Sequence, residues 1–459
     1  MTPKPSEEGR IVRIVFLALL LDLLSFTIIL PLFPRLLNFY QFHDTHQNSI
    51  LQYLLRWLHD YKLWLNKEND VKWDTVILGG FIGSLFSLLQ FMVSPWIGFT
   101  SDKYGRRKVL LWTMISNMLS TAIWLIAQSF HLFLAARILA GLSEGNVQLS
   151  IAIISDITST EHRSKNMALV GIAFATAFTF GPPLGAWFAS IDISQTWLVD
   201  WIPGLYPYSM AALVGLILLV IETIYLYVSL PETAFRTTTQ SVSSTQYKQQ
   251  QKQQQQQHEH IRKLNLLQCL FSFLFSGMEF TLVFLTFDIL DYSHMQQGKL
   301  LGYMGILSAV IQGGYVRRRG QIIGERRLIL QGMISGVMGL GCLAVVGMGI
   351  ESFNTTWMVP LWLYGGVACL AMTSGTVVNS LTSLVSVQCE DHGKDKGKTL
   401  GVFRSFGQLG RACGPLSACT LYWLVGPSWC YGFGSMAMFC LLLLSIGILP
   451  HSPTAIKID

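Results

Sequence analysis

The 459-residue chain carries far fewer charged residues than a soluble protein of its size. Only 13% of the residues are Asp, Glu, Lys or Arg, whereas a soluble domain has about 25%. The hydrophobic residues make up 51%, and the mean hydropathy is +0.45. Such a chain cannot cover a globule of this size with polar surface, which excludes a soluble enzyme.

Twelve apolar runs are long enough to cross a membrane as helices. A hydrocarbon core about 30 Å thick requires about 20 residues at about 1.5 Å per residue. The runs lie near residues 12–34, 75–98, 108–128, 130–154, 166–190, 207–230, 266–288, 299–316, 328–349, 356–387, 399–425 and 429–449. We therefore expect an all-α membrane protein with twelve transmembrane helices.

Two irregular segments interrupt this series. Residues 237–260 are rich in Thr, Ser and Gln, have few apolar residues to bury, and are expected to be disordered. Residues 35–74 contain apolar side chains at helical spacing, which predicts an amphipathic helix in the outer membrane interface or, alternatively, a cap over the substrate opening. The expected organisation is an N-terminal six-helix bundle with this outer insertion (1–230), a Gln-rich linker (231–265) and a C-terminal six-helix bundle (266–459).

Lys and Arg gather in alternate connections between the runs. They follow the second, fourth, eighth and tenth runs, and the opposite connections contain almost none apart from the long one after the first run. By the positive-inside rule the basic connections face the cytoplasm, so both termini and the linker are expected there. A multi-pass protein of the plasma membrane or an endomembrane is indicated, and its charge of +6 does not point to nucleic acid.

The two halves also resemble one another in sequence. A shift of 233 residues places RSKNMALVG (163–171) over KGKTLGVFR (396–404), and it aligns Asn146 with Asn379 and Gly181-Pro182 with Gly414-Pro415. Many transporters are built from such repeats, with their sites at the repeat interface. We interpret the chain as two copies of one six-helix unit.

The connection after the second run, GFTSDKYGRRKVLL (98–111), combines glycines with placed charges. Asp102 can pair with Arg106 and face the positive end of a neighbouring helix, while glycine permits a tight turn. This loop resembles the signature motif of the major facilitator superfamily through Gly98, Asp102, Lys103, Gly105, Arg106 and Arg107. The resemblance implies a charged latch that holds one access state, with Asp156 joining its network.

The fifth run contains AFTFGPPLGA (177–186), which resembles the Gly-Pro motif of proton-driven antiporters of this family through Gly181, Pro182 and Gly185. Gly and Pro let helices pack closely and bend, and Gly414 with Pro415 repeat the pattern in the second half. Ala177 and Ala186 replace the usual glycines, and close packing without any bearing on antiport is the alternative.

The whole chain is most similar to a eukaryotic branch of the superfamily related to tetracycline transporters. The segments LLLDLLSFTIILPLFP (19–34) and TLGVFRSFGQLGRACGPL (399–416) carry much of this similarity. The resemblance implies a transporter of organic anions, including drug-like acids, whose helices 1, 4, 7 and 10 surround a central cavity.

Ionisable and amide side chains inside the runs are functional candidates because burying them in a membrane is unfavourable. Helical spacing puts Arg137, Glu144 and Gln148 on one face of the fourth helix. The candidates for proton coupling are Asp22, Glu279, Glu144 and Arg137, and those for substrate binding are Arg404, Arg411, Gln90, Gln312, Asn146 and Asn379. Structural hydrogen bonds of the two carboxyls Asp22 and Glu279, and a backbone-carbonyl clamp by Arg411, are the alternatives. Glu222 in the sixth run is expected to be partly exposed.

These features predict a monomeric secondary transporter that exchanges protons for small organic anions by alternating access. No cofactor or metal is expected, and His258 and His260 are interpreted as linker residues. The chain lacks the Gly-x4-Gly-Lys-Ser/Thr loop of ATP-driven pumps. The alternatives are a uniporter and a transport-inactive receptor or scaffold on the same fold.

Overall fold

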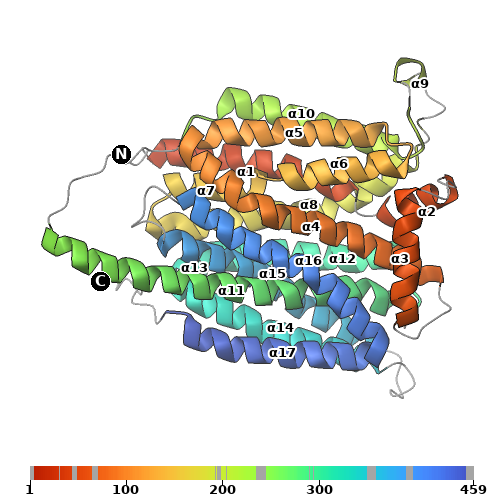
Figure 1. Cartoon of the computed structure of the whole chain (residues 1–459). Helices are drawn as coiled ribbons and strands as arrows, with labels where there is room; N and C mark the ends of the chain where they lie inside the picture. The colour runs from red at the N-terminus through yellow and green to blue at the C-terminus, as the bar shows by residue number, and fades with distance from the viewer. Residues whose placement is uncertain are drawn as a thin grey trace.

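The computed structural model describes residues 5–29, 32–43, 49–64, 71–191, 193, 198–202, 204–233, 244–288, 290–292, 294–348, 358–388 and 396–450. Within these ranges the chain forms helices and no strands. The long helices lie side by side, with the N-terminal half above the C-terminal half and the start of α1 on the same side as the end of α17 (Figure 1). The glycosylation sequon at Asn354 falls outside the described residues.

Twelve helical segments correspond to the twelve apolar runs. In the N-terminal half they are α1 (Pro5–Ile28), α4 (Val71–Tyr104), α5 (Arg106–Leu125), α6 (Phe130–Ser143) followed by α7 (Asn146–Ile157), α8 (Thr160–Ala189) and α10 (Ser209–Ser229). In the C-terminal half they are α11 (Ser244–Asp288), α12 (His294–Val310) continued by the π-helical segment η3 (Ile311–Val316) and α13 (Arg317–Ile323), α14 (Glu325–Gly347), α15 (Met358–Gln388), α16 (Lys396–Val425) and α17 (Pro427–Ile448). The predicted all-α architecture is confirmed.

Two sequence expectations about the irregular segments need correction. Disorder over 237–260 is wrong for its described part, because α11 starts at Ser244 and runs through the Gln tract without a break. Glutamine is a good helix former, and the apolar part of α11 supplies the nucleus from which the helix extends. Residues 237–243 lie outside the described ranges.

The insertion after α1 contains two helices where the spacing predicted one. These are α2 (Phe33–His43) and α3 (Ile50–Trp64), and α3 stands across the end of the bundle opposite the chain termini (Figure 1). The amphipathic pattern of α3 is present, since Leu51 and Leu58 are buried whereas Tyr53 and Trp57 are exposed. A short helix, α9 (Leu198–Trp201), lies beyond α8 at the same end.

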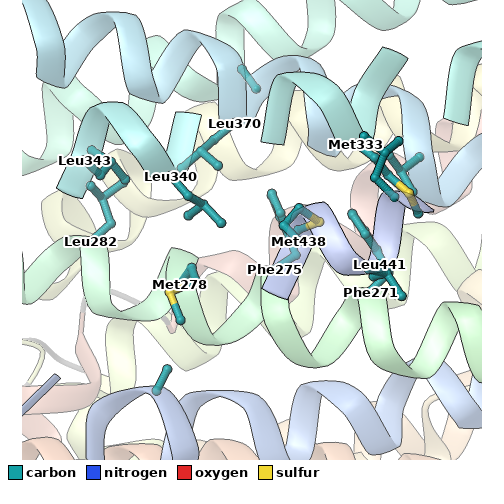
Figure 2. Packing of buried hydrophobic residues seen from close by; sticks show 14 of the residues in the cluster. Phe271, Phe275, Met278, Leu282, Met333, Leu340, Leu343, Leu370, Met438 and Leu441 are labelled. Carbon is teal, nitrogen blue, oxygen red and sulfur yellow. The ribbon is translucent and has the colours of Figure 1, made fainter. Parts of the chain in front are cut away.

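Each half has its own apolar core. In the C-terminal half, side chains from α11, α14, α15 and α17 interdigitate, with Phe275 and Met438 near the centre of the view in Figure 2. The N-terminal half contains two further clusters, which are built around α1 and around α6. Apart from Ala152, every buried member of these three large clusters belongs to the half in which the cluster lies.

The two halves meet mainly along two pairs of helices, and α15 also packs against α8. α16 lies along α4, and the α12–α13 segment lies along α8. At the first pair the backbones approach closely, since a Cβ on Gly98 would collide with the carbonyl of Gly397 and one on Gly401 would come within 2.6 Å of the Ser94 carbonyl. Glycine is required at these positions because no side chain fits between the helices.

Candidate functional site

Three carboxyl groups of the N-terminal half lie in one cluster. Asp22 comes from α1, Glu144 from the junction of α6 and α7, and Glu222 from α10. Asp22 and Glu222 are 2% and 0% exposed, while Glu144 is half-buried. The Asn146 amide donates to Glu222 Oε1 (2.7 Å) and also lies beside Asp22. Full burial of Glu222 corrects the expectation that it is partly exposed near a helix end.

A break in the fourth membrane segment positions this cluster. α6 ends at Ser143 and α7 begins at Asn146, because Glu144 leaves the helical conformation with φ −69° and ψ 87°. Arg137 and Glu144 still line one cavity, whereas Gln148 does not, so the predicted common face is wrong for Gln148. Gln148 instead donates to the Ser94 carbonyl of α4 (2.8 Å), next to the contact of α4 with α16.

Two guanidinium groups face the carboxyl cluster. Arg404 of α16 lies within electrostatic range of Glu144 and Asp22, so it crosses from the C-terminal half. Arg137 lies within range of Glu144, and its guanidinium stands over the Phe86 ring, 4.7 Å from the centroid. The site thus joins carboxyl groups of the N-terminal half to the Arg404 guanidinium of the C-terminal half.

Glu279 and Arg411 form a second charged site within the C-terminal half. They come from α11 and α16, and Glu279 lies within electrostatic range of Arg411. Glu279 is half-buried and Arg411 is exposed. Arg404 and Arg411 influence one another across two turns of α16, which agrees with their predicted common face.

The remaining amide candidates are used in helix contacts. Asn379 of α15 donates to Gln312 Oε1 (3.3 Å), and Gln312 donates to Ser308 Oγ (3.0 Å). A Cβ on Gly171 of α8 would collide with both amides, so they pack directly against the opposite half. Gln90 of α4 is buried at 5% exposure. Substrate binding by these amides stays a prediction.

The loop between α4 and α5 has the contacts predicted for Asp102. Its carboxylate pairs with Arg106 Nη1 (2.7 Å) and accepts hydrogen bonds from the backbone N–H groups of Gly397 (2.9 Å) and Lys398 (2.8 Å). These N–H groups belong to the first turn of α16, where a negative charge is favoured. Asp102 therefore links the N-terminal half to the start of a helix in the C-terminal half.

The same loop holds its shape through further contacts. Arg106 also pairs with Asp156 Oδ2 (2.9 Å), and its backbone N–H donates to Glu232 Oε1 (2.8 Å). Gly105 has φ +102°, a conformation in which a side chain would be strained. Arg107 donates to the Tyr227 carbonyl (2.5 Å). Lys103, which is exposed, stands over the Tyr104 ring at 5.2 Å from its centroid.

Two contacts whose donors are aligned by the internal repeat join the halves at this end. Arg163 donates to the Ser386 carbonyl at the end of α15 (3.3 Å), and Lys396 donates to the Ser155 carbonyl near the end of α7 (2.6 Å). The hydroxyls of Ser155 and Ser386 are hydrogen-bonded to each other. The sequence analysis missed this role, although its repeat alignment already places Arg163 over Lys396.

The Gly-Pro positions pack helices within each half. A Cβ on Gly181 or Gly185 would collide with Thr27 or with the Ile28 carbonyl of α1. A Cβ on Gly414 would collide with the Phe273 carbonyl of α11. Pro182 and Pro415 lie inside α8 and α16, and both helices continue past them. These contacts agree with the close-packing interpretation.

Comparisons with known proteins identify what this arrangement is similar to. The family described as Major Facilitator Superfamily matches residues 15–415. Major facilitator superfamily domain-containing protein 10 of Mus musculus is 34% identical over 98% of this chain and 95% of its own length. Tetracycline resistance protein, class B, of Escherichia coli is 22% identical over 80% of this chain and 84% of its own. The crystal structure of the human organic anion transporter MFSD10 (TETRAN) has a TM-score of 0.76 and 31% identity, and covers 96% of this chain and 100% of its own.

Proposed function

We propose that this chain, which belongs to the major facilitator superfamily of membrane transporters, carries small organic anions by proton-coupled antiport with alternating access. The substrate class is supported by the human relative, which is described as an organic anion transporter. Coupling to protons is supported by the carboxyl cluster and by the Gly-Pro motif, which resembles that of antiporters.

The observation that carries this proposal is the meeting of Arg404 with Asp22 and Glu144 across the two halves. If the halves rock about a central site, the distances from the Arg404 guanidinium to the carboxyl groups of Asp22 and Glu144 change. Protonation of the acids then changes the relative energies of the two orientations, which is the requirement for coupling. Arg404 and Arg411 also offer guanidinium donors that suit a carboxylate or sulfonate substrate.

The end that carries Asp102, Asp156 and Arg163 is proposed to be the cytoplasmic gate, closed here. The basic connections lie at this end, together with the start of α1 and the end of α17, and the positive-inside rule assigns it to the cytoplasm. Opening would release the first turn of α16 from Asp102. We propose that the protein works in this way as a monomer.

The position of Arg404 favours a second candidate, cotransport of a proton with the anion. When the acids near Arg404 are ionised, they neutralise its charge and repel an anion. When they are protonated, the guanidinium is free to bind an anionic substrate. Proton and anion would then bind together, and the sign of coupling would be opposite to antiport.

Uptake into proteoliposomes of radiolabelled p-aminohippurate, an organic anion, tests the proposal. Antiport predicts accumulation when the lumen is acidic, and cotransport predicts accumulation when the outside is acidic. Downhill flux that ignores the gradient would indicate a uniporter, and no flux in a screen of organic acids and amines would indicate a receptor or scaffold.

The proton carriers are tested in the same assay. Asp22→Asn and Glu279→Gln should each reduce pH-driven flux, whereas Glu259→Gln should not, since Glu259 is exposed on the Gln-rich part of α11. If Asp22→Asn and Glu279→Gln both leave pH-driven flux unchanged, the assignment of the proton carriers is wrong.

A further inference from the structure

The charges of the cluster in the N-terminal half do not balance. The ionisable groups that face one another are three carboxyls and two guanidiniums: Asp22, Glu144, Glu222, Arg137 and Arg404. If all are ionised, three negative and two positive charges leave one uncompensated negative charge. Such a charge is strongly disfavoured in a buried site, and one bound proton removes it.

The geometry places this proton between Asp22 and Glu222. The amide of Asn146 donates to Glu222 Oε1 (2.7 Å) and lies beside Asp22, and Asn117 of α5 donates to Asp22 Oδ1 (3.4 Å). The other oxygens, Asp22 Oδ2 and Glu222 Oε2, are buried and have no hydrogen-bond partner among the described residues. Glu222 lies within electrostatic range of Asp22, and buried carboxyls that interact in this way do not titrate as independent groups.

The break in the fourth segment explains why Asn146 reaches both carboxyls. Asn146 is the first residue of α7, and Ser150 donates to its amide oxygen (3.3 Å), which fixes the side chain. Its amide nitrogen is then directed toward α1 and α10. A Cβ on Gly145 would come within 2.9 Å of Thr113, so the backbone at the break is held against α5.

A cavity with both polar and apolar walls lies beside the pair in the N-terminal half. Its wall includes Ser25, Asn117, Thr121, Trp124, Arg137 and Glu144, and Asn117 connects it to Asp22. Trp124 Nε1 is buried without a hydrogen-bond partner in the described part of the chain. A cavity with several polar groups and a free donor suits water, which can deliver a proton without entering the interface between the halves.

We propose that Glu222 is a proton-holding residue of the transport cycle, sharing one proton with Asp22 across Asn146; this inference rests on the proton-coupled function proposed above. Loading forms one O–H bond on a carboxylate oxygen with a proton taken from hydronium in the adjoining cavity. Release returns the proton to water and restores the carboxylate. Glu222 lies on α10, which is the sixth membrane helix and not one of the four helices expected to surround the central cavity. The proton on Glu222 and the anion would then occupy separate places.

The variant Glu222→Gln tests this assignment with little structural change. Glutamine has nearly the same shape and keeps an oxygen that accepts the hydrogen bond from Asn146. Thr223→Val is the matched control, because Thr223 is the next residue of α10 and bonds the Leu219 carbonyl of its own helix. Both variants are compared with the unmodified full-length chain after reconstitution.

Three measurements separate a proton-holding role from a structural one. The first is the infrared carbonyl band of protonated carboxylic acid, followed against pH without substrate. The second is pH-driven uptake of p-aminohippurate, and the third is its counterflow, in which labelled and unlabelled substrate exchange without net proton movement. A residue needed only for folding would reduce uptake and counterflow together.

For Glu222→Gln we expect the midpoint of the carbonyl band to move by about one pH unit or more toward acid, because removing one of two interacting acids makes the other easier to ionise. We also expect pH-driven uptake to fall by about tenfold, because a pKa one unit lower leaves the remaining acid about tenfold less protonated at a given pH, while counterflow is retained. Thr223→Val should behave as the unmodified chain. An unchanged band and unchanged driven uptake would overturn the role of Glu222.

The outcomes distinguish this inference from the proposed function. If the unmodified chain shows pH-driven uptake and Glu222→Gln matches it, the role of Glu222 fails alone. If the unmodified chain shows no pH-driven uptake, the proposed coupling itself fails. Should Glu222→Gln not fold, Glu222→Asp retains an acid at a changed distance from Asn146, and its pH midpoint should shift; an unshifted midpoint contradicts the proposal.

Discussion

Removing the Asp102 carboxylate should open the end of the molecule that carries the chain termini. The substitution Asp102→Ala deletes the acceptor for the backbone N–H groups of Gly397 and Lys398, which are the only contacts of this side chain that cross between the halves in the described part of the structure. Arg106 keeps its second carboxylate partner, Asp156. The loop should therefore stay folded while the link to α16 is lost.

The magnitude follows from these two bonds. At the low end of about 1.5 kcal/mol for a hydrogen bond to a charged group, they sum to about 3 kcal/mol. Water replaces part of this at a partly exposed site, which leaves about 2 kcal/mol. Since about 1.4 kcal/mol corresponds to a factor of ten, the population open at this end should rise about 30-fold.

Labelling of a buried position at this end measures that population. Ser386 is fully buried where α15 meets α7, so a Ser386→Cys side chain should react with a maleimide only after opening. The rate is read by mass spectrometry of the peptide that contains it, because the chain has eight cysteines of its own. When opening is fast and rare, the labelling rate is proportional to the open population.

The matched control is Lys108→Ala, which removes an exposed charge from the first turns of α5 without touching α16. We expect labelling about 30-fold faster with Asp102→Ala and unchanged with Lys108→Ala. Equal labelling in the Asp102→Ala and unmodified backgrounds would refute the latch, and so would an equal increase in the control.

Three further predictions concern packing and are checked by thermal unfolding in detergent. Gly185→Ala should lower the free energy of unfolding by about 1–3 kcal/mol, because its Cβ would collide with α1. Gly432→Ala has open space around its Cβ and should raise the free energy of unfolding by up to about 1 kcal/mol. Arg163→Met should destabilise by about 2 kcal/mol, since it leaves buried carbonyls of both halves without a donor, and a melting temperature equal to that of the unmodified chain would contradict this. Leu58→Ala should destabilise by about 2–5 kcal/mol, while the exposed Leu63→Ala should have little effect.

The sequence predicts well what depends on local spacing. Run length predicted the twelve helical segments, ten of which are long and apolar enough in the described residues to cross a membrane. The partners Asp102 and Arg106 lie close enough in the chain for one loop motif to bring them together. The partner at the start of α16 was predicted only as the positive end of some helix, because hydropathy does not say which helices meet. The identity of that helix is a tertiary property.

The features that the sequence did not predict share a physical cause. The break at Glu144 falls in the short stretch Ser143-Glu144-Gly145-Asn146, but apolar residues on both sides make 130–154 long enough for one span, so run length alone did not predict it. Glu222 stands in an apolar helix, and its burial depends on a partner, Asn146, that is 76 residues away in the chain. The Gln tract is helical because the end of α11 templates it, which composition alone does not reveal.

The division of the apolar cores has a consequence for assembly. Each large cluster is completed almost entirely within its own half, while the seam between the halves is made of glycine contacts, helix-end caps, hydrogen bonds and one small apolar cluster of Ala168, Val316 and Leu328. Each half therefore obtains most of its hydrophobic burial without the other. Two separately expressed polypeptides, divided between α10 and α11, should therefore each insert into the membrane and associate there. The Gln-rich tether of the intact chain keeps the halves close together and does not determine how they pair.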